Sequence, residues 1–225
     1  MFYPGDLDRS AFFARYAEHF DTVEINNTFY NLPEPETFEA WRTQAAEGFE
    51  YAVKMSRYGT HMKKLKEPEN WIGTFLERAD ILGERLGPVL LQLPPKWNPD
   101  IDRLEAALRA APADHRWALE VRDPAWFRDD IYECLRRHGC ALVIHDLIDD
   151  HPRVATAPFV YIRMHGPDPH TPYTGGYDAR TLRGLSQRVS NHASDGRDVY
   201  VYFNNDAEGD APFDALKLKE YAGIA

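Results

Sequence analysis

Residues 89–146 have the sequence VLLQLPPKWNPDIDRLEAALRAAPADHRWALEVRDPAWFRDDIYECLRRHGCALVIHD, and this stretch decides the fold class. Three short apolar runs, 89–93, 117–121 and 141–145, alternate with two segments of helical spacing. Runs that are apolar almost throughout are typical of strands covered on both faces, as in parallel sheets. Asp100 and Asp123 favour helix starts, and Gly139 favours a helix end. The stretch therefore predicts alternating strands and helices in an α/β fold.

The same alternation extends to both ends of the chain. Four further runs, at 22–26, 51–54, 159–163 and 199–203, bring the predicted strands to seven. No Gly-rich phosphate fingerprint follows any of these runs, which disfavours a dinucleotide-binding sheet. Every strand ends in polar residues, as in a TIM-type (β/α) barrel, whose strand ends meet at one mouth. We expect such a barrel, as a single domain over residues 1–225, with seven of eight strands recognisable and no covering helix between 146 and 158.

Composition and charge exclude several classes of protein. The 225 residues are 44% hydrophobic, 13% aromatic and 28% charged, which indicates a packed globular domain rather than a disordered or membrane protein. A formal net charge of −10 argues against a general nucleic-acid coat, although a local basic pocket is compatible with it. Cys134 and Cys140 have neither metal-ligand spacing nor the density of a secreted scaffold, so we expect reduced thiols and a cytoplasmic location. No apolar run approaches the ~20 residues that cross a bilayer, so no membrane partner is expected.

The candidate site consists of polar residues at the strand ends. A buried polar group without a partner costs several kcal/mol, so these residues must pair with one another or with a ligand. Glu24 or Glu120 is suited to move a proton, and the cations are suited to hold a phosphate or carboxylate group. The predicted catalytic residues are Glu24, Glu120 and His165, and the predicted substrate-binding residues are Asn26, Lys54, Gln92, Arg122, Arg163, Asn204, Asn205 and Asp206.

Other interpretations of these residues stay open. Each charged residue alone is also compatible with a structural salt bridge. His145, Asp146, His165 and the glutamates are of metal-ligand types, but no short fixed spacing supports a metal centre, so no metal ligand and no cofactor are assigned. No Gly-x-Ser-x-Gly turn is present, which disfavours acyl transfer. The Pro-, Gly- and Tyr-rich loop 164–177 predicts either a lid over the mouth or a rigid surface excursion.

Several of these segments resemble the signature segments of the YecE-like family, the domain of unknown function 72 (DUF72). The match runs in order along almost the whole chain and implies a TIM-type barrel in the cytoplasm with no established activity. Members of this family usually have a Gly-Thr-Ser-Gly-Trp-like strand and loop ahead of the segment that corresponds here to Phe2-Tyr3-Pro4, so we expect the first strand to be absent and a gap between the strands at 22–26 and 199–203. The similar segments are 24–33, 51–54, Thr60-His61, 91–95, Glu120-Val121-Arg122, 163–166 and 202–206.

Two hypotheses of different classes follow for the function. The first is an enzyme on a small phosphate- or sugar-containing substrate, of hydrolase, phosphodiesterase or isomerase type, by analogy with other barrels. The alternative is a non-catalytic module that binds a nucleic-acid end or a partner protein at the same mouth. The acidic net charge counts against a nucleic-acid partner.

Overall fold

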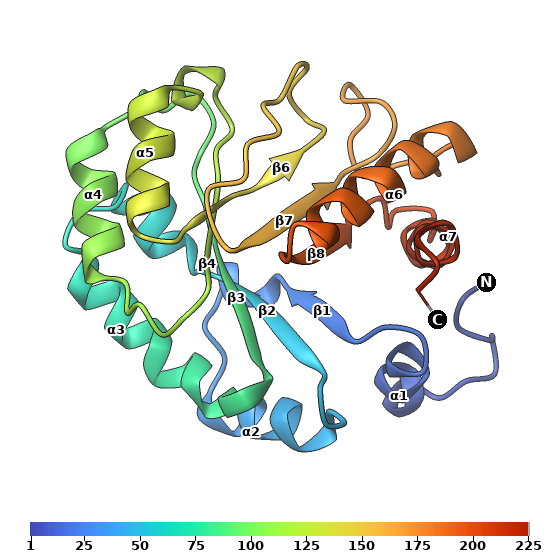
Figure 1. Cartoon of the computed structure of the whole chain (residues 1–225). Helices are drawn as coiled ribbons and strands as arrows, with labels where there is room; N and C mark the ends of the chain where they lie inside the picture. Colours follow the sequence, from blue (N-terminus) through green and yellow to red (C-terminus); the bar gives the residue numbers. More distant parts are fainter. Residues whose placement is uncertain (225) are drawn as a thin grey trace.

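Two parallel β-sheets form the centre of the molecule in the computed structural model, which describes residues 1–224 (Figure 1). The first sheet has the order β1 (Thr22–Ile25), β2 (Glu50–Lys54), β3 (Leu86–Gln92), β4 (Trp117–Glu120) and β5 (Ala141–Leu142). The second has the order β6 (Ile144–His145), β7 (Phe159–Met164) and β8 (Asp198–Phe203). Every strand pair is parallel, which confirms the predicted α/β class.

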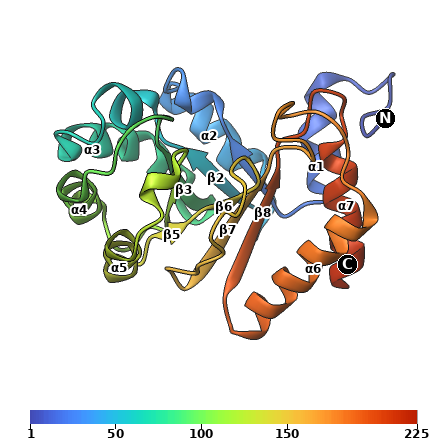
Figure 2. The same cartoon turned by 90° about the horizontal axis from the view of Figure 1, so that it is seen from above.

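Seven α-helices of residues 1–224 surround the strands, with α3 to α5 on one side and α6 and α7 on the other (Figure 2). The predicted cap at Asp100 is confirmed, whereas Asp123 caps only the short turn Pro124–Trp126, and the α-helix that follows begins at Asp129 without a side-chain cap. The Asp100 carboxylate accepts from Arg103 N at 3.1 Å, and that of Asp178 accepts from Thr181 N at 2.7 Å. The bounds are α1 (Phe12–Ala17), α2 (Pro35–Gln44), α3 (Pro68–Ala79), α4 (Ile101–Ala110), α5 (Asp129–Arg137), α6 (Ala179–Ser194) and α7 (Ala211–Ala222). None of the helices in residues 1–224 is long and apolar enough to cross a membrane.

The interior between the two sheets has an apolar layer and a polar layer above it. Side chains along a strand alternate between faces, so residues two apart point the same way. On each of five strands, a buried apolar or aromatic residue is followed two positions later by a polar residue on the same face. The pairs are Ala52 and Lys54, Leu90 and Gln92, Ala118 and Glu120, Tyr161 and Arg163, and Tyr202 and Asn204. This alternation places the predicted site residues together at the carboxyl ends of the strands.

The predicted strand at 141–145 divides into β5 and β6, so the strands form two sheets instead of the single sheet expected. On the edge of β5 that faces β7, backbone groups form hydrogen bonds with the side chain of Thr156, a residue of the connection between β6 and β7. Thr156 Oγ1 accepts from Leu142 N at 2.7 Å and donates to Cys140 O at 2.7 Å. These bonds replace backbone pairing with β7, which begins to pair only at Ile144. Both cysteines are free and buried.

Strands β1 and β8 do not pair with each other among the described residues, so the expected gap between them is present. A cavity of about 430 Å³ lies there, lined by Val23, Val201 and Phe203 among others. Thr22 Oγ1 contacts the Tyr202 hydroxyl at 2.7 Å across it. All four β1 residues are half-buried, whereas those of β4 are fully buried, because β1 is a sheet edge. Closure into a barrel stays a prediction.

Candidate functional site

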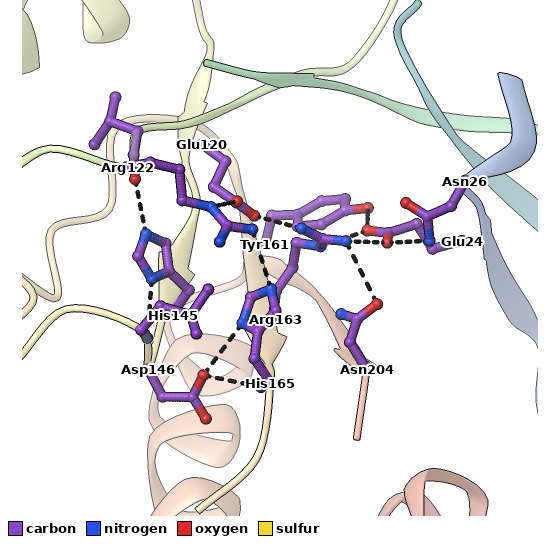
Figure 3. A network of polar contacts seen from close by, with 12 residues as sticks. Glu24, Asn26, Glu120, Arg122, His145, Asp146, Tyr161, Arg163, His165 and Asn204 are labelled. Carbon is purple, nitrogen blue, oxygen red and sulfur yellow. Dashed lines mark hydrogen bonds and ion pairs between the residues drawn. The ribbon is translucent and has the colours of Figure 1, made fainter. Parts of the chain in front are cut away.

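Arg163, on β7, lies at the centre of the polar layer (Figure 3). Its Nε and Nη2 atoms donate to the two carboxylate oxygens of Glu24 at 2.9 and 2.7 Å, and its Nη1 donates to Glu120 Oε2 at 2.7 Å. The Glu24 and Glu120 side chains are 4% and 0% exposed. One guanidinium therefore joins β1, β4 and β7 through two buried carboxylates, with the two-pronged geometry that only arginine offers.

Both carboxylates are held in the ionised form. Burial acts to raise the pKa of Glu24, but the charge of Arg163 and hydrogen bonds from Arg163, Tyr161 and Asn26 outweigh it and leave the pKa below its ordinary value. For Glu120, burial is likewise outweighed, by the charges of Arg163 and Arg122, and the pKa lies well below the usual range. All four carboxylate oxygens accept hydrogen bonds within the cluster.

Arg122 connects this cluster to a histidine–aspartate pair. Its Nε pairs with Glu120 Oε1, and its Nη2 lies 3.4 Å from His165 Nε2. On the other side of the imidazole ring, His165 Nδ1 lies 3.2 Å from Asp146 Oδ1, which also accepts from His165 N at 2.8 Å. The Tyr177 hydroxyl donates to Asp146 Oδ2. With Nδ1 protonated toward Asp146, His165 presents Nε2 as an acceptor toward Arg122.

His145, a predicted metal-ligand type, has both ring nitrogens bonded to the backbone. Its Nε2 donates to Val121 O at 2.8 Å, and its Nδ1 accepts from Leu147 N at 3.2 Å. Burial lowers its pKa to about 4, so the ring is neutral at physiological pH. The described residues place one set of metal-ligating atoms within 4.8 Å of one another, Glu105, Cys134 and His138. That set belongs to α4, α5 and the residue after α5, outside the polar layer.

Lys54 ends β2 and has no ion-pair partner among the described residues. Its side chain is nearly buried, and Nζ lies 4.2 Å from the centroid of the Phe29 ring. Thr28 Oγ1 donates to its carbonyl at 2.7 Å, which ties the end of β2 to the segment after β1. Burial, with the charge of Arg163, lowers the Lys54 pKa to about 8. The charges of the two carboxylates and the two guanidiniums of the cluster cancel. Lys54, when protonated, therefore adds a positive charge to a site that is otherwise neutral.

Two amide side chains flank the Glu24–Arg163 pair, each with one atom unpaired. Asn26 Nδ2 donates to Glu24 Oε1 at 2.9 Å, and Asn204 Oδ1 lies 3.4 Å from Arg163 Nη2. The remaining atoms, Asn26 Oδ1 and Asn204 Nδ2, are buried without a partner within residues 1–224. One is a free acceptor and the other a free donor. Buried groups of this kind cost about 1–3 kcal/mol each unless a ligand or water satisfies them.

The structure brings together most of the predicted site residues, with two exceptions. Asn205 does not join the cluster, because its Nδ2 donates to Gly175 O and to Asp214 Oδ2, both at 2.8 Å. Asp206 is exposed and lines the cavity between β1 and β8. Gln92 shares the inward face of its strand with Leu90, and its register partner on β4 is Glu120.

Two residues of the network, Tyr161 and Tyr177, escaped the sequence prediction, and a third, Asp146, was considered only as a metal-ligand type. Tyr161 donates to Glu24 Oε2 at 2.6 Å, and its position two before Arg163 is the signal that places it on the same face. Asp146 and Tyr177 support His165, and only Asp146 carries a sequence signal, as a polar residue at a strand end. The loop 164–177 packs onto the site, because the Tyr173 ring lies 5.8 Å from that of His165 and Ala207 N donates to Tyr173 O at 3.2 Å.

Comparison with known proteins assigns the family. The family model "Protein of unknown function DUF72" matches residues 1–225. The chain belongs to the DUF72 family. This DUF72 chain is 34% identical to the UPF0759 protein YecE of Escherichia coli over 113 residues, which are 50% of this chain and 42% of that protein. It therefore matches less than half the length of YecE. It is 25% identical to the UPF0759 protein YunF of Bacillus subtilis, over 93% of this chain and 88% of YunF.

Solved DUF72 structures have the same fold. A DUF72 family protein of Thermotoga maritima superposes with a TM-score of 0.85 and 28% identity, over 97% of this chain and 91% of the other. One from Enterococcus faecalis has a TM-score of 0.83 and 22% identity, over 96% and 95% of the two chains. These similarities support an α/β fold with parallel sheets for this uncharacterised family.

Proposed function

We propose that this DUF72 protein is an enzyme that transfers a proton on a small anionic carbonyl compound of the sugar phosphate class, an isomerase-type reaction. The observation that carries the proposal is the Lys54 amine, nearly buried and without an ion-pair partner, beside a charge-balanced cluster of buried ions. A group with a pKa of about 8 exchanges protons readily near neutral pH. In this proposal Lys54 takes and returns the proton.

The other site residues have binding or positioning roles in the proposal. Arg122, whose side chain is 15% exposed, pairs with the anionic group of the substrate. The free acceptor of Asn26 and the free donor of Asn204 bond to substrate hydroxyls, and Gln92 contributes a further amide. Arg163 holds Glu24 and Glu120 in place, and the ionised carboxylates keep Arg122 directed at the site.

His165, together with Asp146, is the second acid–base group of the proposal. Its side chain is fully buried, with the Tyr173 ring of the same loop packed against it, so in this proposal Tyr173 must move for a substrate to reach Nε2. The Asp146 carboxylate, hydrogen-bonded to Nδ1, orients the imidazole so that Nε2 can accept a proton. Two proton-transferring groups, one on β2 and one after β7, are what an isomerisation requires at two neighbouring carbons.

The test is hydrogen exchange from solvent into candidate substrates. Dihydroxyacetone phosphate, fructose 6-phosphate and ribulose 5-phosphate are incubated in deuterated buffer, and loss of the proton next to the carbonyl is followed by NMR. We expect exchange with at least one compound and a fall of about 100-fold or more in Lys54→Met. Exchange should rise with pH up to about 8, as Lys54 loses its proton.

Lys66→Met is the matched control, because Lys66 is exposed and only its backbone atoms form hydrogen bonds, with Lys63 and Trp71. It should leave exchange at the level of the original protein. Equal exchange in Lys54→Met, or no exchange with any compound, would overturn the proposal and leave the non-catalytic binding module as the better hypothesis.

A further inference from the structure

A second cavity, of about 1160 Å³, lies on the outer side of the second sheet, between helix α6 and the segment that follows β6. The connection from β6 to β7 contains no helix (Figure 1), unlike the connections between β1 and β5. No helix of this connection therefore covers β6, whereas α6 packs on β7, and Ile144, Ile162 and Met164 line the cavity. Ile162 and Met164 alternate with Arg163 along β7, so this wall of the cavity is on the opposite face from Arg163, while His145 and Asp146 at the end of β6 also line the cavity.

One wall of this outer cavity is a basic stripe of α6. Arg180, Gly184, Arg188 and His192 follow one another at intervals of four residues, so they lie on one face of the helix, and all four line the cavity. Arg153 lines it from the opposite side. Arg188 is half-buried, and neither it nor Arg153 has an ion-pair partner among the described residues. Burial and the charge of Arg153 both lower the pKa of Arg188, as expected for two neighbouring cations without a counter-charge.

Gly184 leaves the Arg188 guanidinium accessible. A Cβ atom built on Gly184 would lie 3.8 Å from Arg188 Nη1, so the guanidinium extends back over the glycine, as helical side chains do. A larger residue at this position would fill the cavity beside it. The unpaired arginines and the absent side chain together make an open site for an anion.

The rest of the lining indicates what the anion is attached to. Ile148, Met164 and Pro167 are apolar, and Asp149 and Asp150 are carboxylates that form no ion pair with these arginines among the described residues. The other two lining carboxylates already have partners, since Asp178 caps α6 and Asp146 accepts hydrogen bonds from His165 N and the Tyr177 hydroxyl. Carboxylates bind ribose hydroxyls, apolar side chains bind a base, and arginines bind phosphate. A cavity of this volume has space for all three groups.

We propose that the outer cavity is a binding site for a nucleoside monophosphate, with the phosphate between Arg153 and Arg188. The site adjoins the one in the proposed function, because Asp146 and Tyr177, which support His165, also line it, but Lys54 and the Glu24–Arg163 pair do not. The phosphate supplies the counter-charge that the two arginines lack, and Arg180 adds a third positive charge at the edge.

Calorimetric titration with adenosine monophosphate, adenosine and inorganic phosphate, at low ionic strength, tests this site. We expect adenosine monophosphate to bind more tightly than either of the other two. Arg188→Met should weaken its binding about tenfold or more, which is the loss expected for a charge-assisted bond to phosphate. Arg183→Met is the matched control, because Arg183 is on the same helix but stacks on Tyr221 with its guanidinium 4.4 Å from the ring centroid.

Substitutions of Gly184 test the same site without removing an arginine. Gly184→Glu places a carboxylate one turn before Arg188, a favoured ion pair, and should abolish binding while stabilising the helix. Gly184→Ala should retain it. Unchanged affinity in both Arg188→Met and Gly184→Glu, or inorganic phosphate binding as tightly as adenosine monophosphate, would overturn the proposal. Lys54→Met should bind the nucleotide normally, so this result is independent of the proposed function.

Discussion

Replacement of Arg163 by methionine tests whether this residue holds the polar layer together. Methionine fills a similar volume but leaves Glu24 and Glu120 buried without their cation. Breaking a buried ion pair by removing one partner costs about 3–5 kcal/mol, which is a large part of the ~5–15 kcal/mol by which domains are stable. We expect Arg163→Met to lower the free energy of unfolding by about 4 kcal/mol at neutral pH. Urea unfolding, followed by tryptophan fluorescence, measures this difference.

The pH dependence of the loss distinguishes charge from packing. In the original protein the pKa values of Glu24 and Glu120 lie below those of the unfolded chain, so their stabilisation is present above about pH 4.5 and is lost as the pH falls through the folded values. In Arg163→Met the positive charge that counteracts burial is removed, so burial should raise the pKa values of Glu24 and Glu120. The variant then regains stability when the carboxylates are protonated. Each unit of difference in one pKa corresponds to about 1.4 kcal/mol.

The difference in unfolding free energy between the two proteins should therefore be greatest near pH 7 and shrink toward about pH 4.5. The double variant Arg163→Met with Glu24→Gln should be less destabilised at neutral pH than Arg163→Met alone, because one unpaired charge is gone. A loss below about 1 kcal/mol, or a loss that is the same at both pH values, would refute the reasoning.

Three further predictions concern other parts of the structure. Gly59→Ala should destabilise the protein by about 1–3 kcal/mol in thermal unfolding, because the new Cβ overlaps the Trp71 ring, whereas Gly73→Ala, which has open space within α3, should be neutral or stabilising; equal effects would contradict this. Burial raises the pKa of Cys134 to about 12 and that of Cys140 further. Both thiols should therefore resist a thiol reagent at about pH 8 until the protein is unfolded, and rapid labelling of the native protein would contradict this. His145, with a pKa of about 4, should stay neutral in an NMR titration down to about pH 5. Its contribution to stability should be lost as the pH falls below about 6.5, the pKa of histidine in the unfolded chain. A titration midpoint above about pH 6 would count against its two hydrogen bonds to the backbone.

Local pattern was enough to predict most strands, the capped helix start at Asp100 and the alternation that brings the site residues together, but the helix expected after Asp123 begins only at Asp129. The five pairs from Ala52 and Lys54 to Tyr202 and Asn204 follow from a period of two and a parallel sheet, both of which are visible in the sequence. The division of residues 141–145 could not be predicted in this way. It depends on Thr156, whose side chain takes the place of a backbone partner for β5.

The sequence by itself determined which residues meet at the carboxyl ends of the strands, because strand period and parallel order are local properties. Only the tertiary structure decided how their charges are shared. From the sequence, Arg163 is one of three cations that could bind an anionic ligand. In the structure its guanidinium forms hydrogen bonds with Glu24 and Glu120, while Lys54 has no ion-pair partner among the described residues. Those partners come from strands 139 and 43 residues away, and the burial that lowers the Lys54 pKa arises only when the sheets enclose it.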